Sequence, residues 1–138
     1  DVYKRQVLRA VQAEFSCGFC TDAQGAQTIG KTFRENHYLL DTHTAVACTV
    51  LDAYRSGTGD QTLTVVESTA SPFKFCASVL DALGVTEHAP GTGVLGQLTA
   101  ETGRPAPTPL ASLAGKPVRF DQVTDRGDMR AVVTEFLR

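Results

Sequence analysis

The sequence has no apolar run approaching the roughly 20 residues that a membrane-spanning helix needs. No continuous apolar stretch follows the charges near its N-terminus, so we expect no signal peptide. Its formal net charge is −2 at pH 7, and its basic residues are scattered rather than clustered. Such a chain carries no electrostatic footprint for nucleic acid or for an anionic membrane. We therefore expect a cytoplasmic protein that binds neither.

The composition is that of an ordinary folded domain. The chain has 138 residues, of which 42% are apolar and 20% charged, so it is not disordered by composition. This length is enough for one compact domain with a single core. We see no internal repeats and no low-complexity tract.

The first six residues need separate treatment. They read DVYKRQ, which is what one reading frame of a common transposase sequencing adapter encodes. We therefore expect residues 1–6 to be adapter-derived, so that residues 7–138 are the part of the chain that folds as the natural protein does. On this interpretation the natural protein begins further upstream, and its N-terminal part is missing from this chain.

The cysteines do not form a metal-binding pattern. Cys17 and Cys20 are spaced as C-x-x-C, whereas Cys48 and Cys76 stand singly in apolar segments. A structural zinc site usually needs about four ligands in close pairs, and a thioredoxin-like pair should follow a strand. Residues 7–15 instead have helical apolar spacing. We predict no metal site and expect small buried thiols, with a non-catalytic α/β module using Cys17 and Cys20 for metal or redox work as the alternative.

Apolar spacing predicts several amphipathic helices. Thr21 is expected to cap one of them, because Gln24 three residues later completes a capping-box pattern. Ser71 and Pro72 suit the N-cap and the first position of another, and Gly84 suits its C-terminal end. The predicted helices are residues 7–15, 22–36, 43–55, 72–83 and 126–137.

One junction between a predicted strand and a predicted helix is the best candidate site. Residues 62–67 (TLTVVE) alternate as a strand does, and residues 117–120 are a possible short edge strand. A strand, a short loop and a helix N-terminus then follow one another across residues 62–72. Open α/β sheets bind ligands at such places. Residues 67–71 are therefore a site candidate on these grounds alone.

Two segments carry a resemblance to a known family. Residues 40–47 (LDTHTAVA) resemble the threonine synthase pattern D-P-H-T-A-V-A, and residues 67–75 (ESTASPFKF) resemble its S-T-A-H-P-A-K-F. Their order and the roughly twenty-residue gap between them also fit bacterial threonine synthases. Thr42, Ser71 and Phe73 depart from the pattern, standing where the family usually has proline, histidine and alanine.

The resemblance implies an enzyme of fold type II among pyridoxal-phosphate proteins, similar to the tryptophan synthase β subunit. The expected fold class is α/β: residues 7–138 would be the C-terminal part of the pyridoxal-phosphate-dependent catalytic domain of such an enzyme, with helices around a small remnant of parallel sheet. The intact enzyme would be a carbon–oxygen lyase that converts O-phospho-L-homoserine and water to L-threonine and phosphate, the last step of threonine biosynthesis. Another β/γ-eliminating lyase of this fold type is the alternative.

The resemblance also assigns roles to residues. The lysine that bonds to the cofactor and the glycine-rich phosphate loop lie upstream in the family, so we expect no catalytic residue here and an inactive chain without its N-terminal part. Thr69 and Ser68 are expected to bind the cofactor, with the Thr69 hydroxyl donating to its pyridine nitrogen; the alternative for Thr69 is a turn residue. His43 and Lys74 are candidate substrate contacts; the alternatives are a capping or packing histidine and a lysine stem packed on Phe75.

Overall fold

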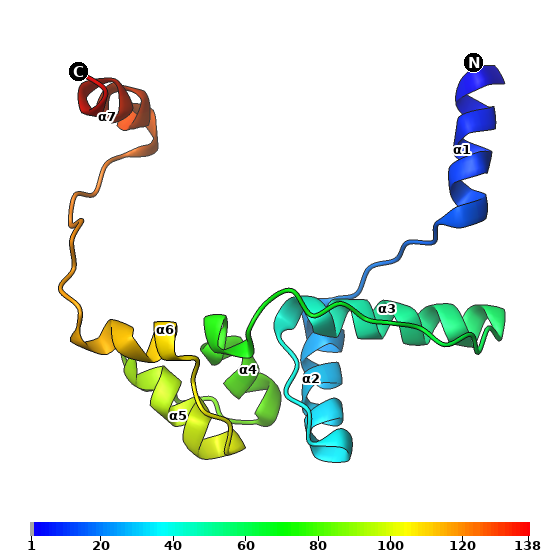
Figure 1. Ribbon diagram of the computed structural model, residues 1–138, viewed down its shortest axis with the longest axis horizontal. Coiled ribbons are helices and arrows are strands. Elements are labelled where there is room, and N and C mark those ends of the chain that lie inside the picture. Colours follow the sequence, from blue (N-terminus) through cyan, green and yellow to red (C-terminus); the bar gives the residue numbers. More distant parts are fainter. Residues whose placement is uncertain (1) are drawn as a thin grey trace.

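The computed structural model describes residues 2–138, and over this range the chain is helical (Figure 1). Its α-helices are α1 (Val2–Glu14), α2 (Asp22–Asn36), α3 (Thr42–Thr58), α4 (Cys76–Leu83), α5 (Gly93–Thr102), α6 (Thr108–Ala111) and α7 (Met129–Phe136). Short 3-10 turns are η1 (Pro72–Lys74), η2 (Ser112–Gly115) and η3 (Arg126–Asp128). Helices α2 to α5 pack together, whereas α1 and α7 stand away at the two ends of the molecule.

The boundaries of α2 follow from its capping residues. Thr21 Oγ1 accepts from the backbone N–H of Gln24 at 3.3 Å, and Gln24 Oε1 accepts from that of Thr21 at 2.8 Å. The predicted capping box is therefore confirmed. The helix ends at His37, which adopts the left-handed conformation with φ of 54°.

The core lies where α2, α3, α4 and α5 meet. Its side chains are apolar and nearly excluded from solvent: Ile29, Leu39, Leu40, Ala45, Phe73, Cys76, Val79, Leu80 and Leu98. Leu98 belongs to α5 and has no exposed surface, so this helix contributes to the core.

The predicted helix over residues 72–83 is present but divided. Residues Pro72–Lys74 form η1, and Phe75 interrupts the helix with φ of −129° and ψ of 39° before α4 begins. Ser71 caps η1 by accepting from the N–H of Phe73 at 3.3 Å, and the Phe73 side chain is only 5% exposed. Gly84 ends α4 with φ of 92°, as predicted.

The expected α/β fold, with helices around a remnant of parallel sheet, is wrong for residues 2–138. No strand forms in that range, and both predicted strands, residues 62–67 and 117–120, are irregular. A strand is held by hydrogen bonds to a neighbouring strand, and within residues 2–138 no segment pairs in this way with residues 62–67 or 117–120. Leu63 and Val65, whose alternation suggested the strand, are 92% and 86% exposed.

Side chains of α3 hold the extended segment in place of a sheet. Arg55 Nη2 donates to the Thr62 carbonyl at 3.1 Å and to Thr64 Oγ1 at 3.2 Å, while Thr44 at the other end of α3 lies 3.1 Å from Ser68. The segment therefore runs back along the helix (Figure 1). The spans agree, because residues 44–55 of a helix cover roughly 16 Å and residues 62–68 of an extended chain roughly 20 Å.

The terminal helices contribute no fully buried residue. Val2 and Tyr3 are 71% and 76% exposed; Asp1, the first of the residues attributed to an adapter, lies outside the described range. The apolar stripe of α7 forms as predicted, yet Phe136 is 86% exposed. Among residues 2–138, no helix is both long and apolar enough to cross a membrane.

Gly30 allows α2 and α4 to approach closely. A Cβ built there would lie 2.6 Å from the Ala82 carbonyl oxygen, whereas one at Gly25 in the same helix would lie no closer than 4.0 Å to the Cys20 sulfur. Both glycines cost helix propensity relative to alanine, but only Gly30 is required by the packing.

We expect Gly30→Ala to lower the free energy of unfolding by about 1–3 kcal/mol, because the new methyl group meets backbone that cannot move aside. Gly25→Ala is the matched control and should raise it by about 0.5–1 kcal/mol. Urea unfolding followed by circular dichroism measures both. Equal effects of the two substitutions would contradict this account of the helix contact.

Candidate functional site

The site begins at the N-terminus of α3, where Asp41 caps the helix. Asp41 Oδ1 accepts from the backbone N–H of His43 at 2.8 Å and from that of Thr44 at 3.2 Å. The Thr44 hydroxyl donates to Oδ2 of the same carboxylate. Asp41 has no exposed surface, so its charge depends on these bonds rather than on water.

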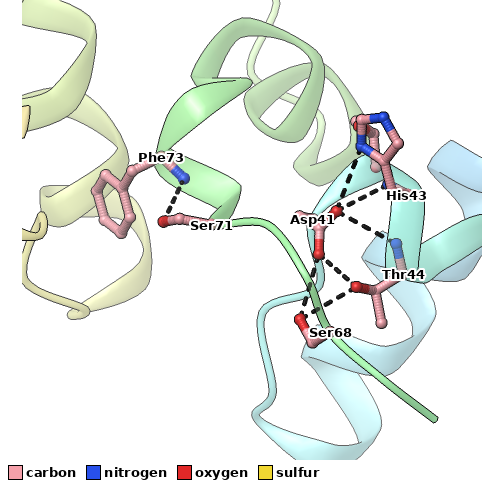
Figure 2. Close-up of polar contacts among 7 residues, drawn as sticks. Asp41, His43, Thr44, Ser68, Ser71 and Phe73 are labelled. Carbon is pink, nitrogen blue, oxygen red and sulfur yellow. Dashed lines mark hydrogen bonds and ion pairs between the residues drawn. The ribbon is translucent and has the colours of Figure 1, made fainter.

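Ser68 joins this cap to the second motif. Its hydroxyl donates to Asp41 Oδ2 at 3.3 Å and lies 3.1 Å from Thr44 Oγ1. Figure 2 shows the segment that carries Ser68 crossing the first turn of α3, with Asp41 facing it. We call Asp41, Thr44 and Ser68 the Asp41 cluster. It connects residues 40–47 with residues 67–75, the two segments that the sequence marked out.

The Asp41 cluster keeps its carboxylate ionised. Burial alone would raise the pKa of Asp41, but hydrogen bonds from the Thr44 hydroxyl, from the Thr44 and His43 amides and from Ser68 outweigh it. The net effect holds the pKa below the ordinary value of 3.8. Hydrogen bonds to an ionised acceptor are stronger than those between neutral groups, so the junction is firmly held at neutral pH.

His43 provides a second contact between the motifs. Its ring centroid lies 5.1 Å from that of Phe75, with an angle of 48° between the planes. The side chain stays 66% exposed, and its Nδ1 is 3.6 Å from Asp41 Oδ1. The imidazole therefore packs on one side and faces solvent on the other.

The remaining predicted site residues differ in whether their side chains form hydrogen bonds or ion pairs. The Thr69 side chain makes no hydrogen bond to any residue of the described range, and Thr69 is exposed. The hydroxyl of its neighbour Ser68 is committed to the Asp41 cluster. Lys74 lies on η1, exposed, and forms no ion pair within residues 2–138. The Thr69 hydroxyl and the Lys74 ammonium therefore both remain available to a ligand on the same segment.

One surface pocket is not lined by the predicted site residues. It has a volume of about 560 Å³ and opens between α2, the start of α3 and α4, and its lining includes Cys20 and Asp81.

The cysteines differ in exposure. Cys76 is buried as expected, and burial raises the pKa of its thiol. Cys17 is exposed, contrary to the expectation of buried thiols.

Comparison with known proteins places this arrangement in a family. A sequence model described as "Threonine synthase, C-terminal" matches residues 44–134, which include Thr44, Ser68 and Thr69. The chain belongs to the threonine synthase C-terminal family. The likeness inferred from two short motifs is thereby extended over α3 to α7, and the chain corresponds to the C-terminal part of threonine synthases.

Curated relatives point to the same family. The chain is 33% identical over 82 residues to "Threonine synthase-like 1" of Mus musculus, covering 59% of this chain and 10% of that protein. It is 29% identical over 84 residues to the protein of the same name from Homo sapiens, covering 61% of this chain and 11% of that protein. The chain therefore spans about a tenth of the length of these relatives.

Sequence reasoning gave no role to the residue on which the Asp41 cluster is built. Asp41 was part of the quoted segment but received no role, although a signal was present. Aspartate is a strong N-cap residue, and Thr44 stands three positions later, within reach of the carboxylate. What the sequence did not reveal is that Ser68, far along the chain, bonds to the same carboxylate.

The lowered pKa of Asp41 has a consequence for stability. Because its folded pKa lies below the unfolded value of 3.8, ionised Asp41 stabilises the fold above that pH. This contribution is lost as the pH falls below 3.8 and through the folded pKa. We expect Asp41→Asn to cost about 1–3 kcal/mol of unfolding free energy at pH 7 and progressively less below pH 4.

The matched control is Asp60→Asn. Asp60 also has a lowered pKa, mainly through hydrogen bonds from Thr62, but unlike the fully buried Asp41 it keeps part of its surface in contact with solvent. Water screens its interactions, so its substitution should change stability far less. Urea unfolding of both variants from pH 2.5 to pH 7 provides the comparison. A cost for Asp41→Asn that does not vary with pH would show that the carboxylate's charge is unimportant.

Proposed function

We propose that this chain is the C-terminal part of a cytoplasmic threonine synthase. The whole enzyme would use pyridoxal phosphate to convert O-phospho-L-homoserine and water to L-threonine and phosphate. The observation that carries the proposal is the Asp41 cluster: it joins both family motifs and leaves the Thr69 hydroxyl, beside Ser68, free for a ligand.

The donor chemistry of Thr69 fits the cofactor. Pyridoxal phosphate, when bound, supplies an electron sink for a carbanion formed beside its imine. A neutral hydroxyl donates to the pyridine nitrogen without favouring its protonation, whereas a carboxylate there would favour the charged ring. In residues 2–138 the Thr69 hydroxyl has no competing partner, so it is available for this bond.

Two side chains are proposed to meet the substrate. The His43 amide already donates to Asp41, so only the imidazole of His43 is available to a ligand. It sits beside Phe75 at the edge of the Asp41 cluster. Lys74, one residue earlier, carries an exposed ammonium whose charge suits the substrate's phosphate or carboxylate.

The rest of the site is proposed to come from the N-terminal part of the protein. In the family this part carries the lysine that bonds to the cofactor and the glycine-rich loop that holds its phosphate. The exposed apolar side of residues 62–67 fits a segment that pairs with strands outside this chain. We propose that the isolated chain is inactive for this reason.

A related lyase with another substrate is the second candidate. Ser71 stands where the family usually has histidine, and its hydroxyl is used to cap η1. Any role of an imidazole two residues from Thr69 is therefore absent or met by another residue. Release of phosphate from O-phospho-L-homoserine, compared with release from O-phospho-L-serine, separates the two candidates in the full-length enzyme.

Variants of Thr69 test the cofactor assignment in the full-length protein. Thr69→Ala should cost about 1–3 kcal/mol, or about 5- to 150-fold in cofactor affinity or turnover, because a buried acceptor loses its donor. Thr69→Ser should be mild, and Thr69→Asp should change the pH dependence of the cofactor's absorbance. Wild-type affinity and turnover in Thr69→Ala would overturn the assignment.

The isolated chain provides a further test. After incubation with pyridoxal phosphate and borohydride reduction, mass spectrometry should find no stoichiometric adduct at a single lysine. The physical reason is that no lysine of this chain occupies the family's cofactor-bonding position. A specific pyridoxyl group on Lys74 would contradict it.

A further inference from the structure

We propose that Asp41 and Ser68 are positioning residues that hold Thr69 in register with the start of α3. The proposal rests on the proposed function, in which Thr69 contacts the cofactor. Neither residue needs to touch a ligand for this role, and the Asp41 cluster uses the polar atoms of both within the protein.

No side-chain hydrogen bond of Thr69 fixes its position within residues 2–138. Thr69 also lies in an irregular segment without sheet pairing. Its position therefore depends on its neighbours. On one side of Thr69, the hydroxyl of Ser68 donates to Asp41. On the other side, the Phe73 side chain is buried in the core, and its backbone N–H donates to Ser71.

The anchor on the Ser68 side is stiff for a physical reason. One oxygen of Asp41 is fixed by two backbone amides of α3, and the other receives the hydroxyls of Thr44 and Ser68. The carboxylate is fully buried, so displacing Ser68 would leave part of a buried charge unsatisfied. Adjacent Cα atoms are about 3.8 Å apart, so fixing Ser68 closely restricts Thr69.

The same carboxylate also orders the other face of the proposed site. The amide of His43, the candidate substrate contact, donates to Asp41 Oδ1, while Ser68, next to the candidate cofactor contact, donates to Oδ2. One buried side chain thus sets the distance between two groups proposed to act on the same reaction. A misplacement of about 1 Å in such a pair is enough to cost catalysis heavily.

A double-mutant cycle in the full-length protein tests the proposal. The measured quantity is the affinity of the apo-protein for pyridoxal phosphate, followed by the cofactor's absorbance, so no turnover is needed. We expect Ser68→Ala to weaken binding roughly 5- to 10-fold. The double variant Ser68→Ala/Thr69→Ala should bind no more weakly than Thr69→Ala alone, because Ser68 acts only through Thr69.

Three further variants separate positioning from general stability. Ser68→Thr keeps the hydroxyl and should restore affinity to near wild type. Asp41→Ser keeps a good helix cap but does not reach Ser68, so it should reproduce the loss seen with Ser68→Ala. Thr62→Val removes a hydroxyl that donates to Asp60 at the other end of the same segment, and this variant should bind the cofactor normally.

The outcomes distinguish this proposal from the function on which it rests. If Thr69→Ala weakens binding but Ser68→Ala does not, or if the two losses multiply, positioning is overturned while the cofactor role of Thr69 stands. If Thr69→Ala binds normally, the cofactor assignment itself fails. An equal loss in Thr62→Val would reduce the effect of Ser68 to ordinary stiffening of the segment and would overturn the proposal.

Discussion

A buried negative charge organises this structure. Asp41 has no exposed surface, so its carboxylate must be satisfied by protein donors, and the chain provides them from two places: the first turn of α3 and Ser68. Both are needed because a carboxylate has more acceptor capacity than a helix cap alone uses. The cost of leaving that capacity unfilled brings the two motifs of a threonine synthase together.

The extended segment before η1 depends on this constraint. Its alternating residues are typical of a strand, but no neighbour in residues 2–138 pairs with it, and α3 holds it instead through Arg55 near one end and Thr44 at the other. Hydrogen bonds from side chains of α3 fix the path of this segment's backbone, but they do not bury its apolar side chains. Leu63 and Val65 therefore stay in solvent, as do much of α1 and α7.

Local signals in the sequence were reliable because their physics is local. The capping box of Thr21, the cap of Ser71 and the end of α4 at Gly84 each involve residues a few positions apart, and each was found as predicted. The strand and the sheet were wrong because pairing is a property of two segments. The packing of α5 on α4, which buries Leu98, likewise depends on two segments and not on either one alone.

The sequence by itself determined the family, the helices with clear caps and the two segments that form the candidate site, because motifs and capping patterns are carried by neighbouring residues. Only the tertiary structure decided which hydroxyl is free. Ser68 and Thr69 are adjacent and chemically alike, yet Ser68 is bonded to a carboxylate 27 positions away and Thr69 is not. That difference arises from the crossing of two distant segments, where the burial of one charge selects its partners.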